Sequence, residues 1–264
     1  MFNYTNQQYL KEDQYKDASN LNARIAIHKY YSVNRQGFHN WIFDAVLKLP
    51  VRAKILELGC GPADMWVEAK DRIPAMWDIT LSDLSSGMLD SAWRNLVVTG
   101  RSYQFKELDA QSIPFADETF DGVVANFMLY HVPDRPKAFA EIKRVLKPGG
   151  RFIAATVGDH HMREIIEVLQ QVDVNHEQYH NPFTLENGLE QIRPFFPSVI
   201  VSHYDDSLKV TEIEPIIAYI RSSIRHADVS KESLEKARAD FENVIDTKGY
   251  FFITKSVGLF EAIK

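Results

Sequence analysis

The segment Glu57-Leu58-Gly59-Cys60-Gly61-Pro62-Ala63 combines a carboxylate with two closely spaced glycines. It follows a short apolar run, 54–58, and precedes a stretch that can form a helix, 64–72. Glycine lets the backbone approach a ligand without a Cβ clash, and a strand-to-helix turn of this kind is typical of nucleotide-binding sites. Alone, the turn is a weak signal.

Two more carboxylates follow predicted strands further along the chain. Asp83 lies 26 residues after Glu57, just past a second predicted strand, where a carboxylate can accept hydrogen bonds from both ribose hydroxyls of an adenosine. Asp109 ends a third predicted strand. Any one of these acids could be a solvated surface group, but open α/β sheets bind ligands along the edge where their parallel strands end. Three acids placed there together therefore favour a ligand site.

His131 is the candidate for acid–base chemistry. It lies in the segment 128–133, after a fourth predicted strand, and an imidazole can exchange a proton near neutral pH. We expect His131 to face the ligand pocket and to accept a proton there. The alternative is a histidine that hydrogen-bonds the backbone and fixes the loop before Pro133.

The sequence offers little for metal or thiol chemistry. His160 and His161 are adjacent, so on a helix they point in different directions, and no third ligand is evident nearby. Cys60, the single cysteine, lies in the glycine turn with no evident base beside it, and we interpret it as a small filler. We therefore expect no metal site.

Strand and helix patterns alternate through the segments that carry these residues, which predicts a parallel β-sheet covered by helices on both faces. After residue 157 the alternation of strands and helices ends. The helices that follow, together with two helices before residue 50, predict a lid over a substrate pocket. The alternative is that these helices only pack against the core. The last two β-rich runs should pair antiparallel. Predicted strands span 54–58, 77–81, 103–108, 120–127, 151–157, 199–210 and 250–262, and predicted helices span 21–49 (two helices), 64–72, 86–96, 135–146, 162–172, 184–195, 215–225 and 231–245.

Composition narrows the class of protein. The 264 residues include 30 Lys+Arg and 36 Asp+Glu, a formal charge of −6, which argues against a nucleic-acid partner in the absence of a basic cluster. No stretch approaches the length of a membrane span, and the polar N-terminal segment lacks the pattern of a signal peptide. With a single cysteine, these features predict a cytoplasmic protein that acts without a membrane or nucleic acid.

From about Lys54 to Val157 the chain resembles the class I S-adenosylmethionine (SAM)-dependent methyltransferases, in particular the small-molecule enzymes related to the ubiquinone-biosynthesis methyltransferases. Six features occur in the family's order and spacing, which is stronger evidence than any single motif. They are Ile55-Leu56-Glu57-Leu58-Gly59-Cys60-Gly61, Leu81-Ser82-Asp83-Leu84-Ser85 with Met88, Leu108-Asp109-Ala110, Ile113-Pro114-Phe115, Phe120-Asp121-Gly122-Val123-Val124, and Arg144-Val145-Leu146-Lys147-Pro148-Gly149-Gly150.

The resemblance implies an α/β fold, a Rossmann-like seven-stranded sheet that is mostly parallel with an antiparallel last strand and carries helical lid insertions. It also implies an enzyme that transfers the methyl group of SAM to a small organic molecule by in-line displacement. Methyl transfer from a sulfonium mainly requires an aligned, desolvated acceptor, so a base is needed only where the acceptor must lose a proton. The expected units are an N-terminal helical cap at 1–50, a SAM-binding core at 51–158, and the remaining strands with the lid at 159–264.

The resemblance further implies roles for individual residues. Glu57, Gly59 and Gly61 would lie near the amino-acid end of SAM, and Asn126 near its methionine moiety and the reaction centre. The ribose would be bound by Asp83. The residues expected near the adenine are Leu84, Met88, Asp109 and Ala110.

Aromatic residues suggest how the site is covered. Relatives often cover the cofactor with an aromatic-rich N-terminal segment, which here assigns Tyr31, with Tyr30 and His28, to the cofactor site. Packing against the core is the alternative for these residues. The lid residues that could line an apolar acceptor pocket are Tyr179, Phe183, Phe195, Phe196, Tyr204 and Tyr219.

Two alternatives stay open. Ala63 stands where many relatives have a third glycine, so weak SAM binding, or a SAM-binding protein without turnover, is compatible with the sequence. A nicotinamide-dependent oxidoreductase would also use the glycine turn and Asp83. The missing third glycine and the motifs at Asp109-Ala110 and 120–124 count against the oxidoreductase.

Overall fold

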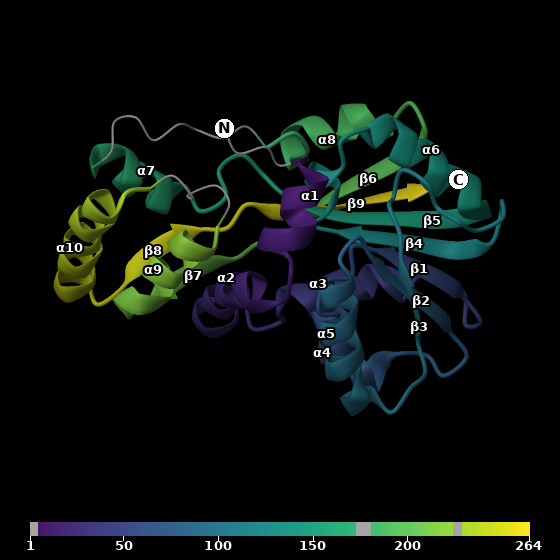
Figure 1. Cartoon of the computed structure of the whole chain (residues 1–264), viewed down its shortest axis with the longest axis horizontal. Coiled ribbons are helices and arrows are strands. Elements are labelled where there is room, and N and C mark those ends of the chain that lie inside the picture. The colour runs from purple at the N-terminus through teal and green to yellow at the C-terminus, as the bar shows by residue number, and fades with distance from the viewer. Residues whose placement is uncertain (1–4, 173–180, 224–228) are drawn as a thin grey trace.

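A computed structural model describes residues 5–172, 181–223 and 229–264. In this part of the chain, seven strands form one sheet in the order β3-β2-β1-β4-β5-β9-β6 (Figure 1). Within the sheet, β9 runs antiparallel to both of its neighbours, β5 and β6, which confirms the predicted mostly parallel sheet with an antiparallel last strand. The strands are β1 (Lys54–Leu58), β2 (Asp78–Asp83), β3 (Gln104–Glu107), β4 (Phe120–Asn126), β5 (Leu146–Val157), β6 (Val199–His203) and β9 (Val257–Ile263).

Helices cover both faces of the sheet, as the alternating pattern predicts. Successive residues of a strand point to opposite faces, so in β4 Val123 and Ala125 pack with α6 and α8, whereas Val124 packs with α3, α4 and α5. Figure 1 shows α6 and α8 above the sheet and α4 and α5 below it. The helices are α3 (Phe38–Val46), α4 (Asp64–Glu68), α5 (Ser86–Leu96), α6 (Arg135–Val145) and α8 (Leu185–Ile192).

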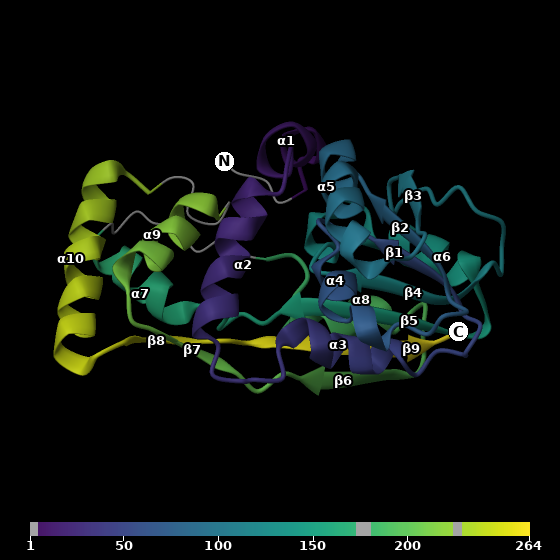
Figure 2. The same cartoon turned by 90° about the horizontal axis from the view of Figure 1, so that it is seen from below.

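A second, smaller body lies beside the end of the sheet. Its two-stranded antiparallel sheet, β7 with β8, packs against four helices around a hydrophobic core of its own, and Figure 2 shows α2 between the other three helices and the main sheet. We call this body the lid. Its elements are α2 (Ser19–Tyr31), α7 (Arg163–Val172), β7 (Ser207–Val210), α9 (Ile213–Ser222), α10 (Lys231–Lys248) and β8 (Phe251–Thr254).

The two late β-rich runs each divide into a core strand and a lid strand, where the sequence predicts unbroken runs at 199–210 and 250–262. The antiparallel pairing of these runs is confirmed twice, between β6 and β9 and between β7 and β8. At the break, the buried Asp206 forms an ion pair with Lys255 and accepts a hydrogen bond from Ser32 Oγ (2.6 Å). Buried polar groups need partners that a continuous pair of apolar strands does not offer. Both segments therefore leave the strand pairing here.

The first 50 residues contribute to both bodies. Helix α2 packs with α9 and β7 in the lid, whereas α3 packs on the main sheet. Before them, a short turn of helix, α1 (Gln7–Tyr9), and the π-helical η1 (Leu10–Gln14) bridge the two bodies: Gln7 Nε2 donates to Asp109 Oδ2 (3.0 Å), and Gln14 Nε2 donates to the Ser222 carbonyl (3.1 Å). The division at residues 50 and 158 stays a prediction. None of the described helices is long and apolar enough to cross a membrane.

Candidate functional site

A cavity of about 680 Å³ lies between the carboxyl ends of the core strands and the lid. Because β1, β2, β3 and β4 are parallel, their ends meet at this edge, and because β9 is antiparallel, its first residue, Val257, lines the same cavity. The lining contains ten of the predicted site residues: Glu57, Gly59, Gly61, Asp83, Leu84, Met88, Asp109, Ala110, Asn126 and His131.

The turn after β1 has the backbone geometry that requires glycine. Gly59 and Gly61 have φ of 62° and 53°, in the left-handed region, and a Cβ on Gly59 would lie 2.7 Å from the Met128 Cβ. Ala63 also has a left-handed backbone, with φ of 65°. Ala63 therefore adopts a backbone conformation that glycine reaches without strain and an alanine does not.

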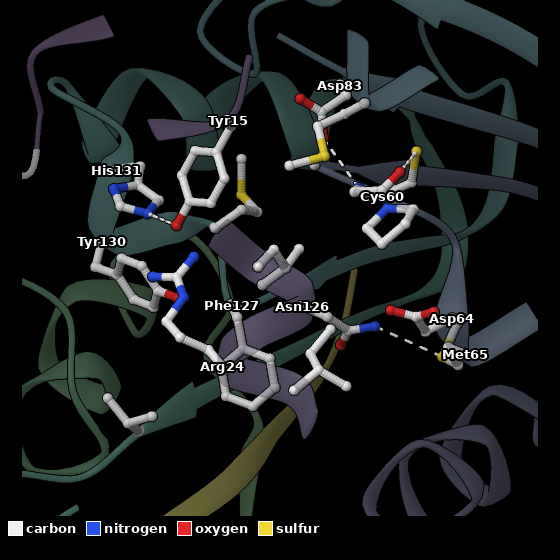
Figure 3. Close-up of a pocket in the computed structure, with 18 of the residues that line it drawn as sticks. Tyr15, Arg24, Cys60, Asp64, Met65, Asp83, Asn126, Phe127, Tyr130 and His131 are labelled. Atoms are coloured by element: carbon white, nitrogen blue, oxygen red, sulfur yellow. Dashed lines mark hydrogen bonds between the residues drawn. The ribbon is translucent and has the colours of Figure 1, made fainter. Parts of the chain in front are cut away.

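Asp83, at the end of β2, is fixed by the glycine turn beside it. Its carboxylate accepts hydrogen bonds from the Gly61 backbone N–H (3.0 Å) and the Ser85 backbone N–H (2.9 Å). Burial raises the pKa of this carboxyl group, and the backbone hydrogen bonds oppose the rise. The carboxylate is thus held rigidly at the cavity wall (Figure 3).

Glu57 is almost fully buried, with 3% of its surface exposed, at the end of β1. Its carboxylate accepts hydrogen bonds from Trp66 Nε1 and from Asn126 Nδ2 (3.2 Å). Burial raises the pKa of Glu57 to about 7, although these two hydrogen bonds lower it. A cation bound in the cavity would favour the ionised carboxylate. The buried Oδ1 of Asn126 has no partner among the described residues and is also available to a ligand.

Asp109, just after β3, already has partners from the loop and from the N-terminal segment. Its side chain accepts hydrogen bonds from the Gln111 backbone N–H (2.9 Å) and from Gln7 Nε2 (3.0 Å). The sequence does not indicate Gln7 as a site residue, because nothing in a polar N-terminal stretch shows that it folds over the end of β3.

His131 lines the cavity, as predicted, and lies 2.9 Å from Tyr15 through its Nε2 and the Tyr15 hydroxyl (Figure 3). The short 3-10 helix η4 (Leu129–His131) after β4 places the imidazole, and the segment after η1 supplies Tyr15. Ser85 Oγ donates to the Tyr15 carbonyl (2.7 Å), which ties this segment to α5. Tyr15 is a further site residue that the sequence did not indicate.

Tyr31 does not line the cavity, and its assignment to the cofactor site stays a prediction. It lies one helical turn after Ile27, and both residues pack with the hydrophobic core of the lid. Tyr30 is exposed, whereas His28 does line the cavity. The face of α2 toward the cavity carries Leu21, Arg24, Ile25, His28 and Lys29.

The other candidates from the sequence divide between the cavity wall and packing positions. His161 lines the cavity and is buried, with its ring 5.6 Å from that of His28, whereas His160 is exposed. The described residues contain no group of three potential metal ligands. Burial raises the pKa of the Cys60 thiol. Of the lid aromatics, Tyr219 lines the cavity, Phe183, Phe195, Phe196 and Tyr204 pack elsewhere, and Tyr179 lies outside the described residues.

Residues 56–154, which include all three acidic strand ends, match the family described as "Methyltransferase domain". These residues form a class I methyltransferase domain. The glycine turn, Asp83, Asp109, Asn126 and His131 all belong to this domain, whereas Tyr15, Arg24 and the lid lie outside it. The resemblance inferred from the motifs is thereby confirmed for the core.

Curated relatives match less than half of this chain. The chain is 38% identical over 103 residues to the ubiquinone/menaquinone biosynthesis C-methyltransferase UbiE of Haemophilus ducreyi, covering 38% of this chain and 39% of that protein. It is 37% identical over 109 residues to the demethylmenaquinone methyltransferase of Thermus thermophilus, covering 41% and 48%. The matches thus span less than half the length of these relatives.

Solved structures show that the fold extends beyond the methyltransferase domain. The [4+2]-cyclase SpnF superposes with a TM-score of 0.60 at 19% identity, over 98% of this chain and 96% of that one. The phosphoethanolamine N-methyltransferase 2 of Haemonchus contortus, in complex with SAM, superposes with a TM-score of 0.59 at 20% identity, over 98% and 59%. At these identities the likeness establishes a shared fold.

Proposed function

We propose that this protein binds SAM in the cavity and transfers its methyl group to a small organic molecule. The observation that carries the proposal is the convergence of Glu57, Asp83 and Asp109, from three neighbouring strand ends, on one cavity beside a glycine turn. The methyltransferase domain contains all three residues. Open α/β sheets bind adenosine ligands at this edge.

The residues present fit an adenosyl sulfonium ligand. A Cβ on Gly59 would fill part of the turn, and the buried Oδ1 of Asn126 lacks a partner among the described residues. Asp83 would bind the ribose hydroxyls, Asp109 and Ala110 the adenine edge, and Glu57 with Asn126 the positively charged methionine end. Leu84 and Met88 would contact the adenine faces. When bound, SAM supplies a methyl group that is already activated for displacement.

The chain's own residues would align the acceptor and remove its proton. Lid and N-terminal residues line the cavity together with the strand ends, and their closing over bound ligands would exclude water and strengthen electrostatic interactions inside it. An acceptor O–H or N–H next to Tyr15 would pass its proton to the Tyr15 hydroxyl as that hydroxyl gives its own proton to His131 Nε2. An acceptor next to His131 would transfer the proton directly.

We also propose that the acceptor is a small molecule rather than a nucleic acid, and that the protein acts in the cytoplasm. The formal charge of −6 supports the first point, because a phosphate backbone would be repelled. The single, buried Cys60 is compatible with a reducing compartment.

Calorimetric titration with SAM, S-adenosylhomocysteine (SAH) and NAD tests the cofactor. We expect both adenosyl ligands to bind and NAD not to bind. Replacing Asp83 by Ala should raise the Kd for SAH about 10- to 100-fold, the loss expected for hydrogen bonds to a charged group. Asp90→Ala, an exposed acid on α5, is the matched control and should leave the Kd unchanged. Binding of NAD alone would contradict the proposal.

A further inference from the structure

Arg24, on the face of α2 toward the cavity, carries a guanidinium group whose hydrogen-bonding capacity is only partly used. Its Nε and Nη2 atoms are buried and have no hydrogen-bond partner among the described residues. These two nitrogens lie on the same edge of the planar group. Together they form the fork that binds two oxygens of one carboxylate or phosphate.

The described surroundings of Arg24 provide no counter-charge. Its guanidinium lies over the ring of Tyr15, 5.4 Å from the centroid, and the titratable groups that influence its pKa are Tyr15, Tyr130 and Tyr219. Tyrosines are neutral at pH 7, so they offer polar and π contacts without neutralising the cation. A buried charge without a partner is costly, and an anion that enters the cavity would remove this cost.

Arg24 and two of the cavity carboxylates lie at different sides of the cavity. In Figure 3, Arg24 lies with Tyr15, Tyr130 and His131 at one side, and Asp64 and Asp83 lie at the other. The other cavity cation near the lid strands, Lys255, is neutralised by its ion pair with Asp206. The acidic side suits the cationic end of SAM, and the side of Arg24 suits a negative group.

His28 adds a second polar atom to the same part of the wall. It lies one helical turn after Arg24, and its buried Nδ1 has no partner among the described residues. Burial, reinforced by the nearby Lys255, lowers the pKa of His28 to about 3, so the ring is neutral at pH 7 and can donate one hydrogen bond. It could therefore bind an anion without adding charge.

We infer that the methyl acceptor carries a carboxylate or phosphate group that binds the Nε and Nη2 edge of Arg24, next to the Tyr15–His131 pair. This inference rests on the proposed function, since it assigns the acceptor half of the same cavity. It specifies a small molecule with one anionic end and, within reach of Tyr15 or His131, a nucleophilic atom to be methylated.

The test uses matched charged and neutral probes. Benzoate, phenyl phosphate and the neutral benzamide are titrated into the ligand-free and the SAH-saturated protein, with ligand-observed NMR as the readout. We expect at least one anionic probe to bind about 10-fold more tightly than benzamide, as a charge-assisted bidentate contact implies. The preference should vanish in Arg24→Gln, persist in part in Arg24→Lys, and persist fully in Lys231→Gln, which removes an exposed charge from α10, away from the cavity lining.

SAH affinity distinguishes an anionic group on the acceptor from the carboxylate of the cofactor as the partner of Arg24. If Arg24 binds the acceptor, Arg24→Gln leaves the Kd for SAH within about 3-fold of the native value, which also shows that the variant is folded. A loss of SAH affinity of about 10-fold or more would assign Arg24 to the carboxylate of the cofactor and overturn the inference. An anion preference that is absent from the native protein, or kept in Arg24→Gln, would overturn it as well.

Failure of the proposed function has a different signature. If the native protein binds neither SAM nor SAH, the methyltransferase proposal fails, and with it the assignment of the anion to a methyl acceptor. The titrations of ligand-free protein then still measure whether Arg24 selects anions. An Arg24-dependent preference with normal SAH binding supports both proposals.

Discussion

Glu57 shows how one buried carboxyl group can link cofactor binding to pH. With a pKa near 7, against an ordinary value of 4.5, the folded protein holds this proton more tightly than the unfolded chain does. The contribution of Glu57 to stability therefore falls as pH rises from about 4.5 to 7, and its full cost, about 3 kcal/mol, is present above pH 7. A cation at the methionine end of SAM would offset that cost.

We therefore expect SAM affinity to weaken by up to about tenfold for each pH unit below 7, because binding must then remove the proton from Glu57. In Glu57→Gln, whose amide can donate to the free Oδ1 of Asn126, affinity at pH 8 should be lower and this pH dependence should disappear. Calorimetric titration of the native protein and of Glu57→Gln with SAM, from about pH 5.5 to 8.5, measures the affinity of each protein and its dependence on pH. The same pH dependence in both proteins would show that another group is responsible.

The Tyr15–His131 pair leads to a prediction about turnover. His131→Gln should reduce methyl transfer about 10²- to 10⁴-fold for an acceptor that must lose a proton, because the variant removes the group that takes the proton. Tyr15→Phe should cause a similar loss where the proton passes through the Tyr15 hydroxyl. SAH affinity should change little, since neither residue is assigned to the cofactor. Single-turnover rates with calorimetric SAH affinity separate the two effects. Normal turnover in His131→Gln with acceptor bound would exclude the base role.

At the scale of elements, the N-terminal segment packs closely against α5 because residue 87 of that helix is a glycine. A Cβ on Gly87 would lie 1.9 Å from the carbonyl oxygen of Lys16, so no side chain fits there without displacing the segment. The segment carries Gln7 and Tyr15 to the ends of β3 and η4. Helix α5 thus positions residues far away in the sequence.

Gly87→Ala should therefore weaken SAM binding and turnover about tenfold or more without loosening the core. Alanine is the better helix former by roughly 1 kcal/mol, so the free energy of unfolding should change little while the N-terminal segment is displaced. Ser86→Ala, at the exposed neighbouring position, is the control. Chemical denaturation beside SAH titration distinguishes the outcomes, and unchanged affinity and turnover in Gly87→Ala would contradict the role of this contact.

At the scale of the molecule, the cavity lies between two bodies that have separate hydrophobic cores. The chain joins them at the Asp206–Lys255 break and through the N-terminal segment. A ligand that contacts both walls should therefore stabilise the lid together with the sheet. Because the lid strands are separate from the core strands, the lid and the sheet can form two walls of one cavity.

SAM at about 100 times its Kd should add about 2.7 kcal/mol to the free energy of unfolding and raise the Tm by roughly 5–10 °C. We expect hydrogen exchange to slow in α2 and α9 as well as at the ends of β1 and β2, because the cavity joins them. Scanning calorimetry and exchange mass spectrometry check the two effects. Protection confined to the core strands would show that the lid does not close on the cofactor.

The sequence by itself determined the core of this protein and many of the residues at the sheet edge that line the cavity. Strand ends and glycine turns are local features, so Glu57, Gly59, Asp83 and Asp109 could be identified from short motifs and from the rule that parallel strands end at one edge. His131 was found for the same reason, since it follows a predicted strand. The order of these motifs also indicated the methyltransferase domain.

Only the tertiary structure decided what covers the site. Tyr15 and Arg24 reach the cavity through packing between segments distant in sequence, and no periodicity encodes such contacts. Tyr31 packs with the lid core rather than at the cavity wall, and aromatic character alone does not tell which face of α2 meets that core. The late strands divide at Asp206 because a buried ion pair forms across the fold, and a single run of apolar residues cannot reveal its partner.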